Sequence, residues 1–216
     1  MNKKSQTVFI VDDDASFLAT MSRWLRVFGY TVKSFTSAAD FLAQRTTDTA
    51  GCVVADLQMP GMDGMALQAA LAQSNNPLPI VFLTGHGDIP TSVQAMRSGA
   101  EDFLLKTASK EDLLAAIERA LARGLYEHEA RQRQYELAQR FKKLTPRENE
   151  VLSHVLQGQL NKQIAADLGI DERSVKRHRS GVMAKLNVKS VVELTQLVDE
   201  AQNNSAIPIP SDAVTR

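Results

Sequence analysis

The chain has 216 residues, enough for two domains of ordinary size, and its 25 basic and 25 acidic side chains cancel. This balance excludes a uniformly basic nucleic-acid-binding protein. No apolar stretch approaches the roughly 20 residues that a membrane helix needs, and no secretory signal pattern follows Met1. The single cysteine, Cys52, lies in an apolar run without a disulfide partner. We therefore expect a soluble cytoplasmic protein without a membrane partner, in which Cys52 is a buried core thiol.

The first half of the chain alternates short apolar runs with amphipathic segments. Strands are expected at 7–11, 31–35, 51–55, 79–83 and 102–105, and helices near 14–28, 37–45, 64–74, 89–98 and 109–122. Five successive strand–helix units predict an α/β domain over residues 1–122, a doubly wound five-stranded parallel sheet with helices on both faces.

Charged residues follow three of these strands directly. Asp12, Asp13 and Asp14 come after the first strand, Asp56 after the third and Lys106 after the fifth. The carboxyl ends of parallel strands meet at one edge of a sheet, so these side chains are expected to converge there. Clustered carboxylates repel one another unless a cation such as Mg2+ lies among them. The sequence thus predicts a metal-assisted site at which Asp56 accepts a phosphoryl group and Lys106 balances the charge.

The second half is helical in pattern. Residues 123–143 are rich in Arg, Glu and Gln and predict a helical linker that continues the fifth helix. A small all-α domain of four helices is expected over 144–200, with helices near 146–157, 161–168, 172–186 and 190–200. Thr145 is the expected N-cap of its first helix, with Pro146 at the first helical position. The tail, 201–216, is expected to be disordered because it contains Pro208 and Pro210.

One helix of this small domain is strongly basic. The segment from Glu172 to Leu186 contains five basic side chains and a single acidic one. It follows a short helix and a turn built on Gly169. This pattern is typical of a helix-turn-helix that places its second helix in the major groove of double-stranded promoter DNA. The expected DNA-binding residues are Asn161, Lys162, Arg173, Ser174, Val175, Lys176, His178, Arg179 and Lys185.

These motifs resemble a known family. Asp12 and Asp13, the run 56–64, Thr84-Gly85, Phe103 and Lys106 resemble a response-regulator receiver domain with a flavodoxin-like fold. The runs 144–152, 161–165 and 174–186 resemble a LuxR-type helix-turn-helix. Together they are similar to two-domain transcriptional regulators of the FixJ/NarL type.

The resemblance implies a role for each matching residue. Asp56 would take its phosphoryl group from a partner sensor histidine kinase; Asp13, Asp56 and the Gln58 backbone carbonyl would bind the cation directly, and Asp12 through water. Thr84 would bond the new phosphoryl group, and Phe103 would turn inward behind it. Phosphorylation would then promote a homodimer through the fourth helix and fifth strand, and RNA polymerase is a further candidate partner.

Several alternatives remain open at the level of sequence. Asp12–Asp14 alone would read as a helix cap with solvated acids. A metal-dependent phosphohydrolase that uses Asp56 as nucleophile would need a second Asp where Gln58 stands, so the chain is not expected to be an enzyme. A third possibility is a DNA-binding regulator whose receiver acts as a docking or dimerisation module without phosphate control. Finally, the family usually has a cis Lys-Pro bond where this chain has Lys106-Thr107, and we expect a trans bond here.

Overall fold

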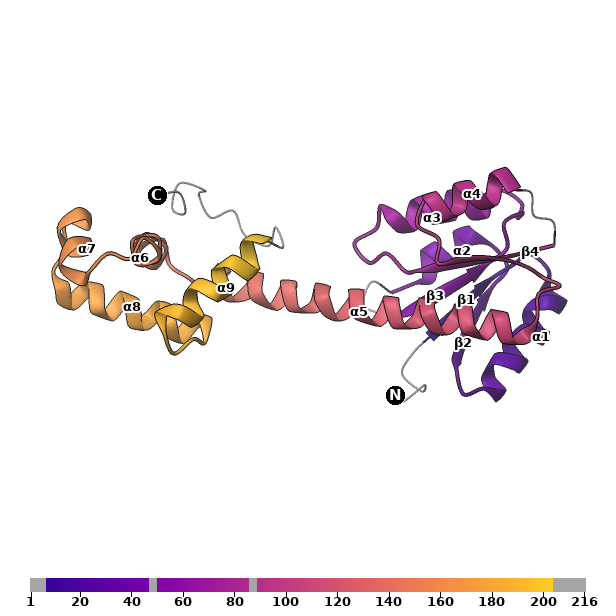
Figure 1. Ribbon diagram of the computed structural model, residues 1–216, viewed down its shortest axis with the longest axis horizontal. Helices are drawn as coiled ribbons and strands as arrows, with labels where there is room; N and C mark the ends of the chain where they lie inside the picture. The colour runs from indigo at the N-terminus through magenta and orange to yellow at the C-terminus, as the bar shows by residue number, and fades with distance from the viewer. Residues whose placement is uncertain (1–6, 47–49, 86–88, 204–216) are drawn as a thin grey trace. The chain divides into compact units, whose positions relative to one another are not determined.

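The computed structural model describes residues 7–46, 50–85 and 89–203, in two units that divide between Glu129 and Ala130. The first unit is a parallel sheet of five strands in the order β2-β1-β3-β4-β5 (Figure 1). Its strands are β1 (Thr7–Val11), β2 (Thr31–Phe35), β3 (Gly51–Ala55), β4 (Ile80–Thr84) and β5 (Asp102–Leu105). Its helices are α1 (Ala15–Val27), α2 (Ala38–Gln44), α3 (Gly64–Ala72), α4 (Ile89–Arg97) and the first part of α5 (Lys110–Lys142).

The sheet separates two apolar cores. On one face, α1 and α5 pack against the sheet through residues such as Leu25 and Ile117. On the other face, α2, α3 and α4 do so through residues such as Phe41 and Leu67. Strands β1, β3 and β4 are buried along their whole length, as expected for parallel strands that helices cover on both sides. The predicted doubly wound fold is confirmed.

Asp side chains start two of the helices close to the carboxyl ends of the strands. The Asp14 carboxylate accepts hydrogen bonds from the amides of Ser16 and Phe17 and begins α1, and Asp63 accepts one from Ala66 and begins α3. Helix starts expose backbone amides that need acceptors. These caps fix where the loops after β1 and β3 turn away from the sheet, and therefore where Asp12 and Asp56 lie.

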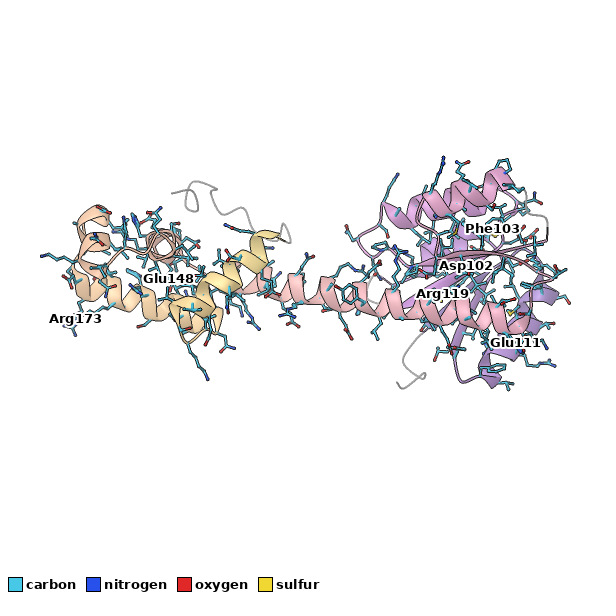
Figure 2. The ribbon with its side chains drawn as sticks, viewed as in Figure 1. Asp102, Phe103, Glu111, Arg119, Glu148 and Arg173 are labelled. Atoms are coloured by element: carbon cyan, nitrogen blue, oxygen red, sulfur yellow. The ribbon has the colours of Figure 1, made fainter. Side chains whose placement is uncertain are left out.

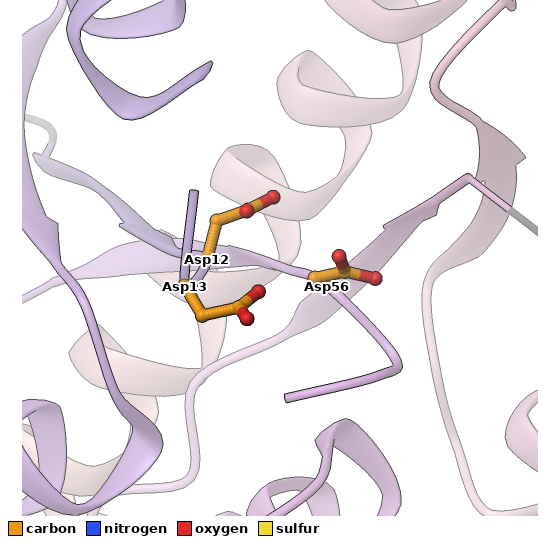
Figure 3. Close-up of side chains that lie close together, drawn as sticks. All are labelled: Asp12, Asp13 and Asp56. Carbon is orange, nitrogen blue, oxygen red and sulfur yellow. The ribbon is translucent and has the colours of Figure 1, made fainter. Parts of the chain in front are cut away.

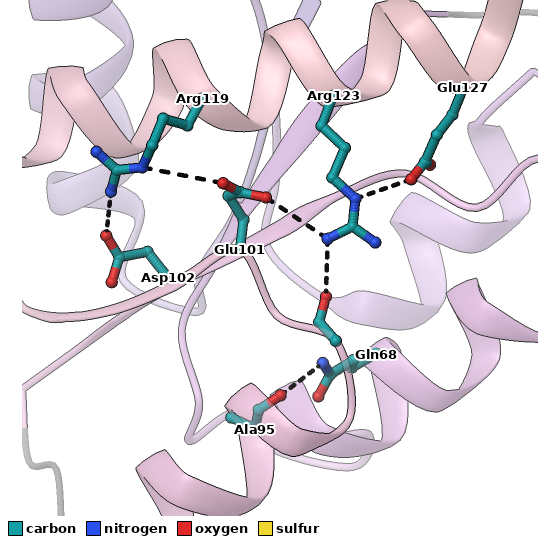
Figure 4. A network of polar contacts seen from close by, with 8 residues as sticks. Gln68, Ala95, Glu101, Asp102, Arg119, Arg123 and Glu127 are labelled. Carbon is teal, nitrogen blue, oxygen red and sulfur yellow. Dashed lines mark hydrogen bonds and ion pairs between the residues drawn. The ribbon is translucent and has the colours of Figure 1, made fainter.

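A polar network attaches α5 to β5 and to the end of α4 (Figure 4). Arg119 contacts Asp102 at 2.6 Å and Glu101 at 3.9 Å, while Arg123 contacts Glu101 at 3.5 Å and donates to the Gly99 carbonyl. Hydrogen bonds to Glu127 and Glu101 raise the pKa of Arg123. The two arginines are half exposed, so each pair contributes little energy alone, but together they fix the register of α5 along the strand.

Gly124 lies buried inside α5, where helix propensity disfavours glycine. A Cβ atom at this position would overlap the Gly51 carbonyl oxygen at the start of β3, and it would also lie 3.3 Å from Cδ of Pro79. The lack of a side chain therefore lets α5 pass directly against the backbone of the sheet.

The second unit is helical and contains α6 (Pro146–Leu156), α7 (Asn161–Leu168), α8 (Glu172–Leu186) and α9 (Val191–Asn203). The predicted cap at Thr145 is confirmed and forms a capping box with Glu148, and Gly169 ends α7 with a left-handed φ of 64°. The core includes Ile164 and Leu186. Phe141, from the end of α5, is buried in the same core.

The last helix and the linker helix differ in how well they match the expected bounds. The tail was expected to be disordered from residue 201, but α9 continues to Asn203 because Ala201 is buried in the core; residues 204–216 lie outside the described part. Helix α5 runs unbroken through 123–142, so the helical continuation is confirmed, and the division between the units falls inside this segment.

Cys52 is fully buried in β3, as predicted, and burial raises the pKa of its thiol. None of the helices within 7–46, 50–85 and 89–203 is long and apolar enough to cross a membrane.

Candidate functional site

Three carboxylates meet at the carboxyl edge of the sheet (Figure 3). Asp12 follows β1 and Asp56 follows β3, and these strands are neighbours in register, with Val11 opposite Ala55. One oxygen of each of Asp12, Asp13 and Asp56 lies within 4.8 Å of the others. Asp12 and Asp56 are buried and Asp13 is exposed. The cluster is therefore open to solvent on the side of Asp13.

Lys106 bridges the two buried members of this cluster. Its Nζ lies 2.6 Å from Oδ2 of Asp12 and 2.8 Å from Oδ2 of Asp56, and 4.5 Å above the centre of the Phe17 ring. Burial alone would lower the pKa of Lys106, but its hydrogen bonds to the two carboxylates outweigh this effect and raise it. Burial raises the pKa of Asp12, although Lys106 and the Asp14 amide oppose the shift. Lys106 thus stays charged.

The cluster fits a divalent cation. Three carboxylates face one ammonium group, and within the described residues Asp13 has no cationic partner. The remaining negative charge and the all-oxygen donor set suit Mg2+ or a similar hard ion. Gln58 is exposed in the loop after β3, and its amide donates to Oδ1 of Asp56 at 3.2 Å. This bond leaves Oδ1 and Oδ2 of Asp56 in different surroundings.

The two predicted switch residues lie on the neighbouring strands. Thr84, at the end of β4, is buried, and its carbonyl accepts the amide of Lys106 at 2.7 Å. Phe103 on β5 is half buried, packs against the core under α4 and lies 6.1 Å from the Phe82 ring, centroid to centroid. Figure 2 shows Phe103 beside Asp102 on the same strand. The Lys106–Thr107 bond is trans, as expected, since no peptide bond of the described segments is cis.

The basic helix α8 exposes one stripe of side chains. The stripe consists of Arg173, Lys176, Arg177 and Ser180, at positions i, i+3, i+4 and i+7 of the helix, and all four side chains are exposed. Figure 2 labels Arg173 near the start of this helix. Arg177 was counted among the basic residues of the segment but not among the expected DNA contacts. The three- to four-residue spacing from Arg173 is the signal that would have found it.

The structure places the other predicted DNA-binding residues in different surroundings. Asn161 and Lys162 begin α7, and Arg179 donates a hydrogen bond of 2.8 Å to the Asn161 side chain. Ser174 bonds the Asp171 cap, and His178 is half buried. The prediction for Val175 is wrong, because this side chain is 0 % exposed and belongs to the core. The basic composition of the helix does not show which of its faces turns inward.

Lys185 has a partner inside the domain. Its Nζ lies 2.6 Å from Oε2 of Glu148, which is 7 % exposed and also accepts the Thr145 amide. A Cβ at Gly181 would approach the same carboxylate closely, so the glycine leaves room for it. Burial alone would raise the pKa of Glu148, but the bonds from Lys185 and Thr145 outweigh this effect and lower it. Lys185 is thus engaged in holding α8 to the start of α6.

Comparison with known proteins agrees with this division of the chain. Residues 8–118 match the family described as response regulator receiver domain, and residues 142–198 match bacterial regulatory proteins, luxR family. Response regulator protein TmoT of Ectopseudomonas mendocina is 40% identical over 204 residues, covering 94% of this chain and 93% of that protein. Transcriptional regulatory protein FixJ of Bradyrhizobium diazoefficiens is 35% identical over 194 residues, covering 90% of this chain and 95% of that protein.

Solved structures are similar over most of the chain. The response regulator StyR matches with a TM-score of 0.84 and 46% identity, covering 91% of this chain and 99% of that one. Full-length FixJ from B. japonicum matches with a TM-score of 0.53 and 33% identity, covering 93% and 98%. The chain therefore belongs to the response regulators that join a receiver domain to a LuxR-type DNA-binding domain, the architecture of phosphorylation-controlled regulators of transcription.

Proposed function

We propose that Asp56 is the phosphoacceptor of this regulator and that a sensor histidine kinase supplies the phosphoryl group. The observation that carries the proposal is the Lys106 ammonium placed between Asp12 and Asp56, next to the exposed Asp13. In the transfer, an Asp56 oxygen attacks phosphorus, the P–N bond to the kinase histidine breaks, and an acyl phosphate forms. The incoming group carries negative charge into a cluster that is already acidic, so cationic groups must offset it.

Mg2+ would supply most of this compensation, with Asp13 and Asp56 as direct ligands together with the Gln58 carbonyl, and Asp12 acting through water. The exposure of Asp13 supports this assignment, because the ion and the phosphoryl group both have to enter from solvent. Lys106 would move with the charge: its Nζ already contacts Oδ2 of Asp56 and can contact a phosphoryl oxygen attached there. The Thr84 hydroxyl and the Phe103 ring would then report the new group to α4 and β5.

Phosphate incorporation from a small phosphodonor tests the assignment. Asp56→Asn should abolish labelling, and Asp13→Ala should reduce it severely, as should omission of Mg2+. Asp63→Asn is the matched control, since Asp63 lies in the same loop but caps α3. Full labelling of Asp56→Asn would exclude the assignment. Labelling without turnover would also set aside the phosphohydrolase alternative, which the exposed amide side chain of Gln58 does not favour. A wild-type chain that takes no label would favour the docking-module alternative.

We further propose that the exposed stripe Arg173, Lys176, Arg177 and Ser180 lies against promoter DNA. Arginine and lysine contact phosphates and guanine edges in the major groove. Lys176→Ala and Arg177→Ala should each weaken binding, and loss of one phosphate contact should lower the salt slope by about one unit. Lys143→Ala removes an exposed cation outside α8 and serves as the control. If both α8 variants bind like the parent chain, the stripe is not the DNA surface.

Dimerisation on phosphorylation is the remaining part of the proposal. Four large apolar side chains, Ile89, Val93, Met96 and Leu105, are exposed on α4 and β5, and such a patch on a polar surface suits a partner copy. A two-fold dimer would present two α8 helices to two half-sites and raise operator affinity without new contacts in either domain. Sedimentation of the phosphorylated chain should show a dimer, and Val93→Asp should keep it monomeric. A phosphorylated monomer on the operator would contradict the proposal.

A further inference from the structure

The second unit contains a cavity of about 710 Å3 beside α8. Its apolar lining comes from three helices: Leu152 and Val155 on α6, Met183 on α8, and Val191 and Leu194 on α9. A volume of this size is typical of pockets that hold small organic ligands. Lys176 and Ser180 of the proposed DNA surface also line this cavity, whereas its apolar walls lie outside that surface.

The rim of this cavity is cationic. Lys176, Arg179 and Lys189 line it, and no Asp or Glu of the described part of the chain is among the lining residues. Among the residues that the structure describes, none of these three cations forms an ion pair, and the bond that Arg179 makes is to the neutral Asn161 amide. Three cationic side chains thus line the pocket beside its apolar walls, and a carboxylate close to them in the chain, that of Glu193, accepts the Lys189 backbone amide at 2.8 Å.

We propose that this cavity binds a small amphipathic organic anion, a carboxylate attached to an alkyl or aromatic body. The body would displace water from the apolar walls, and the carboxylate would pair with Arg179, Lys176 or Lys189 in a charge-assisted bond. An inorganic anion has no body to fill the walls. An amphipathic cation would be repelled by the rim, and a neutral analogue would leave its charges unpaired.

Occupation of the cavity would oppose DNA binding. Lys176 belongs both to the rim of the cavity and to the exposed stripe of α8, so its charge cannot serve a ligand carboxylate and a DNA phosphate fully at the same time. This competition rests on the proposed DNA surface, whereas binding of the anion in the cavity does not. An experiment can therefore contradict the competition with DNA without contradicting the anion site.

Met183 offers a direct reporter. Six of the seven methionines precede residue 130, so Met183 is the only one in the second unit. In the full chain labelled with 13C-methyl methionine, titration with decanoate below its micelle concentration should shift the Met183 signal saturably. Decyltrimethylammonium, which has the same chain and the opposite charge, should not produce this shift. Operator affinity should fall as decanoate saturates the site.

Two neighbouring valines provide the matched variants. Val191 lines the cavity and is 41% exposed, while Val192 is 68% exposed and is not part of the lining. Both are in the first turn of α9, where an acidic residue is tolerated well. Val191→Asp should weaken decanoate binding about tenfold, and Val192→Asp should leave it unchanged. Lys189→Gln should weaken decanoate without affecting decanol.

The outcomes separate the possibilities. No Met183 shift with decanoate, an equal shift with the cationic analogue, or equal binding by the two valine variants would overturn the proposal. Saturable binding that leaves operator affinity unchanged would keep the anion site and overturn its link to DNA. A chain that loses DNA binding on Lys176→Ala yet ignores decanoate would keep the proposed function and reject the site.

Discussion

Replacing Gly124 by alanine tests whether the close approach of α5 to the sheet is required. In a helix interior, Gly→Ala ordinarily stabilises by about 1 kcal/mol because alanine has the higher helix propensity. Here the added Cβ would overlap the Gly51 carbonyl oxygen, well inside the 3.0 Å that real Cβ atoms keep, and would press on Pro79 at 3.3 Å. The first neighbour is backbone and cannot rotate away.

Overpacking of a buried site costs about 1–3 kcal/mol, and more when backbone must move. Set against the gain of about 1 kcal/mol from propensity, the expected net result is a loss of up to about 2 kcal/mol. Helix propensity alone predicts a gain in stability, so the sign of the change in unfolding free energy shows whether overpacking against Gly51 outweighs propensity.

Urea unfolding followed by tryptophan fluorescence measures this change in the first unit alone. Trp24 is the only tryptophan of the chain, and it packs against the core formed by α1 and α5. Ala122→Gly, at an exposed position of the same helix, is the control and should cost about 1 kcal/mol by propensity. Comparison requires equal m-values. A Gly124→Ala chain that is more stable than the parent would refute the packing argument.

Three other outcomes are expected. The lowered pKa of Glu148 means that its ionised form stabilises the second unit at pH values above the ordinary carboxyl pKa of 4.5, and this stabilisation is lost as the pH falls through the lower pKa of the folded state. Glu148→Gln should therefore flatten that part of the pH dependence of unfolding, measured by circular dichroism. An unchanged pH dependence would contradict this expectation. Lys185→Met should destabilise the same unit, leaving DNA affinity per folded molecule close to that of the parent in a salt-matched titration. Lys106→Met should tighten Mg2+ binding in calorimetry, because the ammonium competes for the same carboxylate oxygens; weaker binding would show that Lys106 organises the site instead.

The strands and the acidic cluster could be predicted because both depend on local pattern. Buried parallel strands are continuous apolar runs, and their carboxyl ends must share one edge of the sheet. The proximity of Asp12, Asp56 and Lys106 could therefore be predicted from the sequence. The contact of Lys106 with both carboxylates could not, because it depends on side-chain rotamers and on the path of the loop after β5.

The DNA-binding residues were harder to predict because composition shows that a helix is basic but not which side it presents. Val175 is a core residue, and Lys185 is bound to Glu148, 37 positions earlier in the chain. Such long-range pairing leaves no trace in spacing. Arg177, by contrast, follows from helical geometry once the buried face of α8 is known.

The thiol of Cys52 is buried, so the folded chain should not react with thiol-directed probes, because reaction requires an accessible thiolate. Any cysteine introduced on the surface is then the sole point of attachment for a dye or spin label. Tyr126 and Tyr135 are exposed near the middle of α5, on either side of the division between the units. Labels replacing both would be separated by about 14 Å along an intact helix, so a distance measurement before and after phosphorylation would show whether this helix bends when the signal arrives.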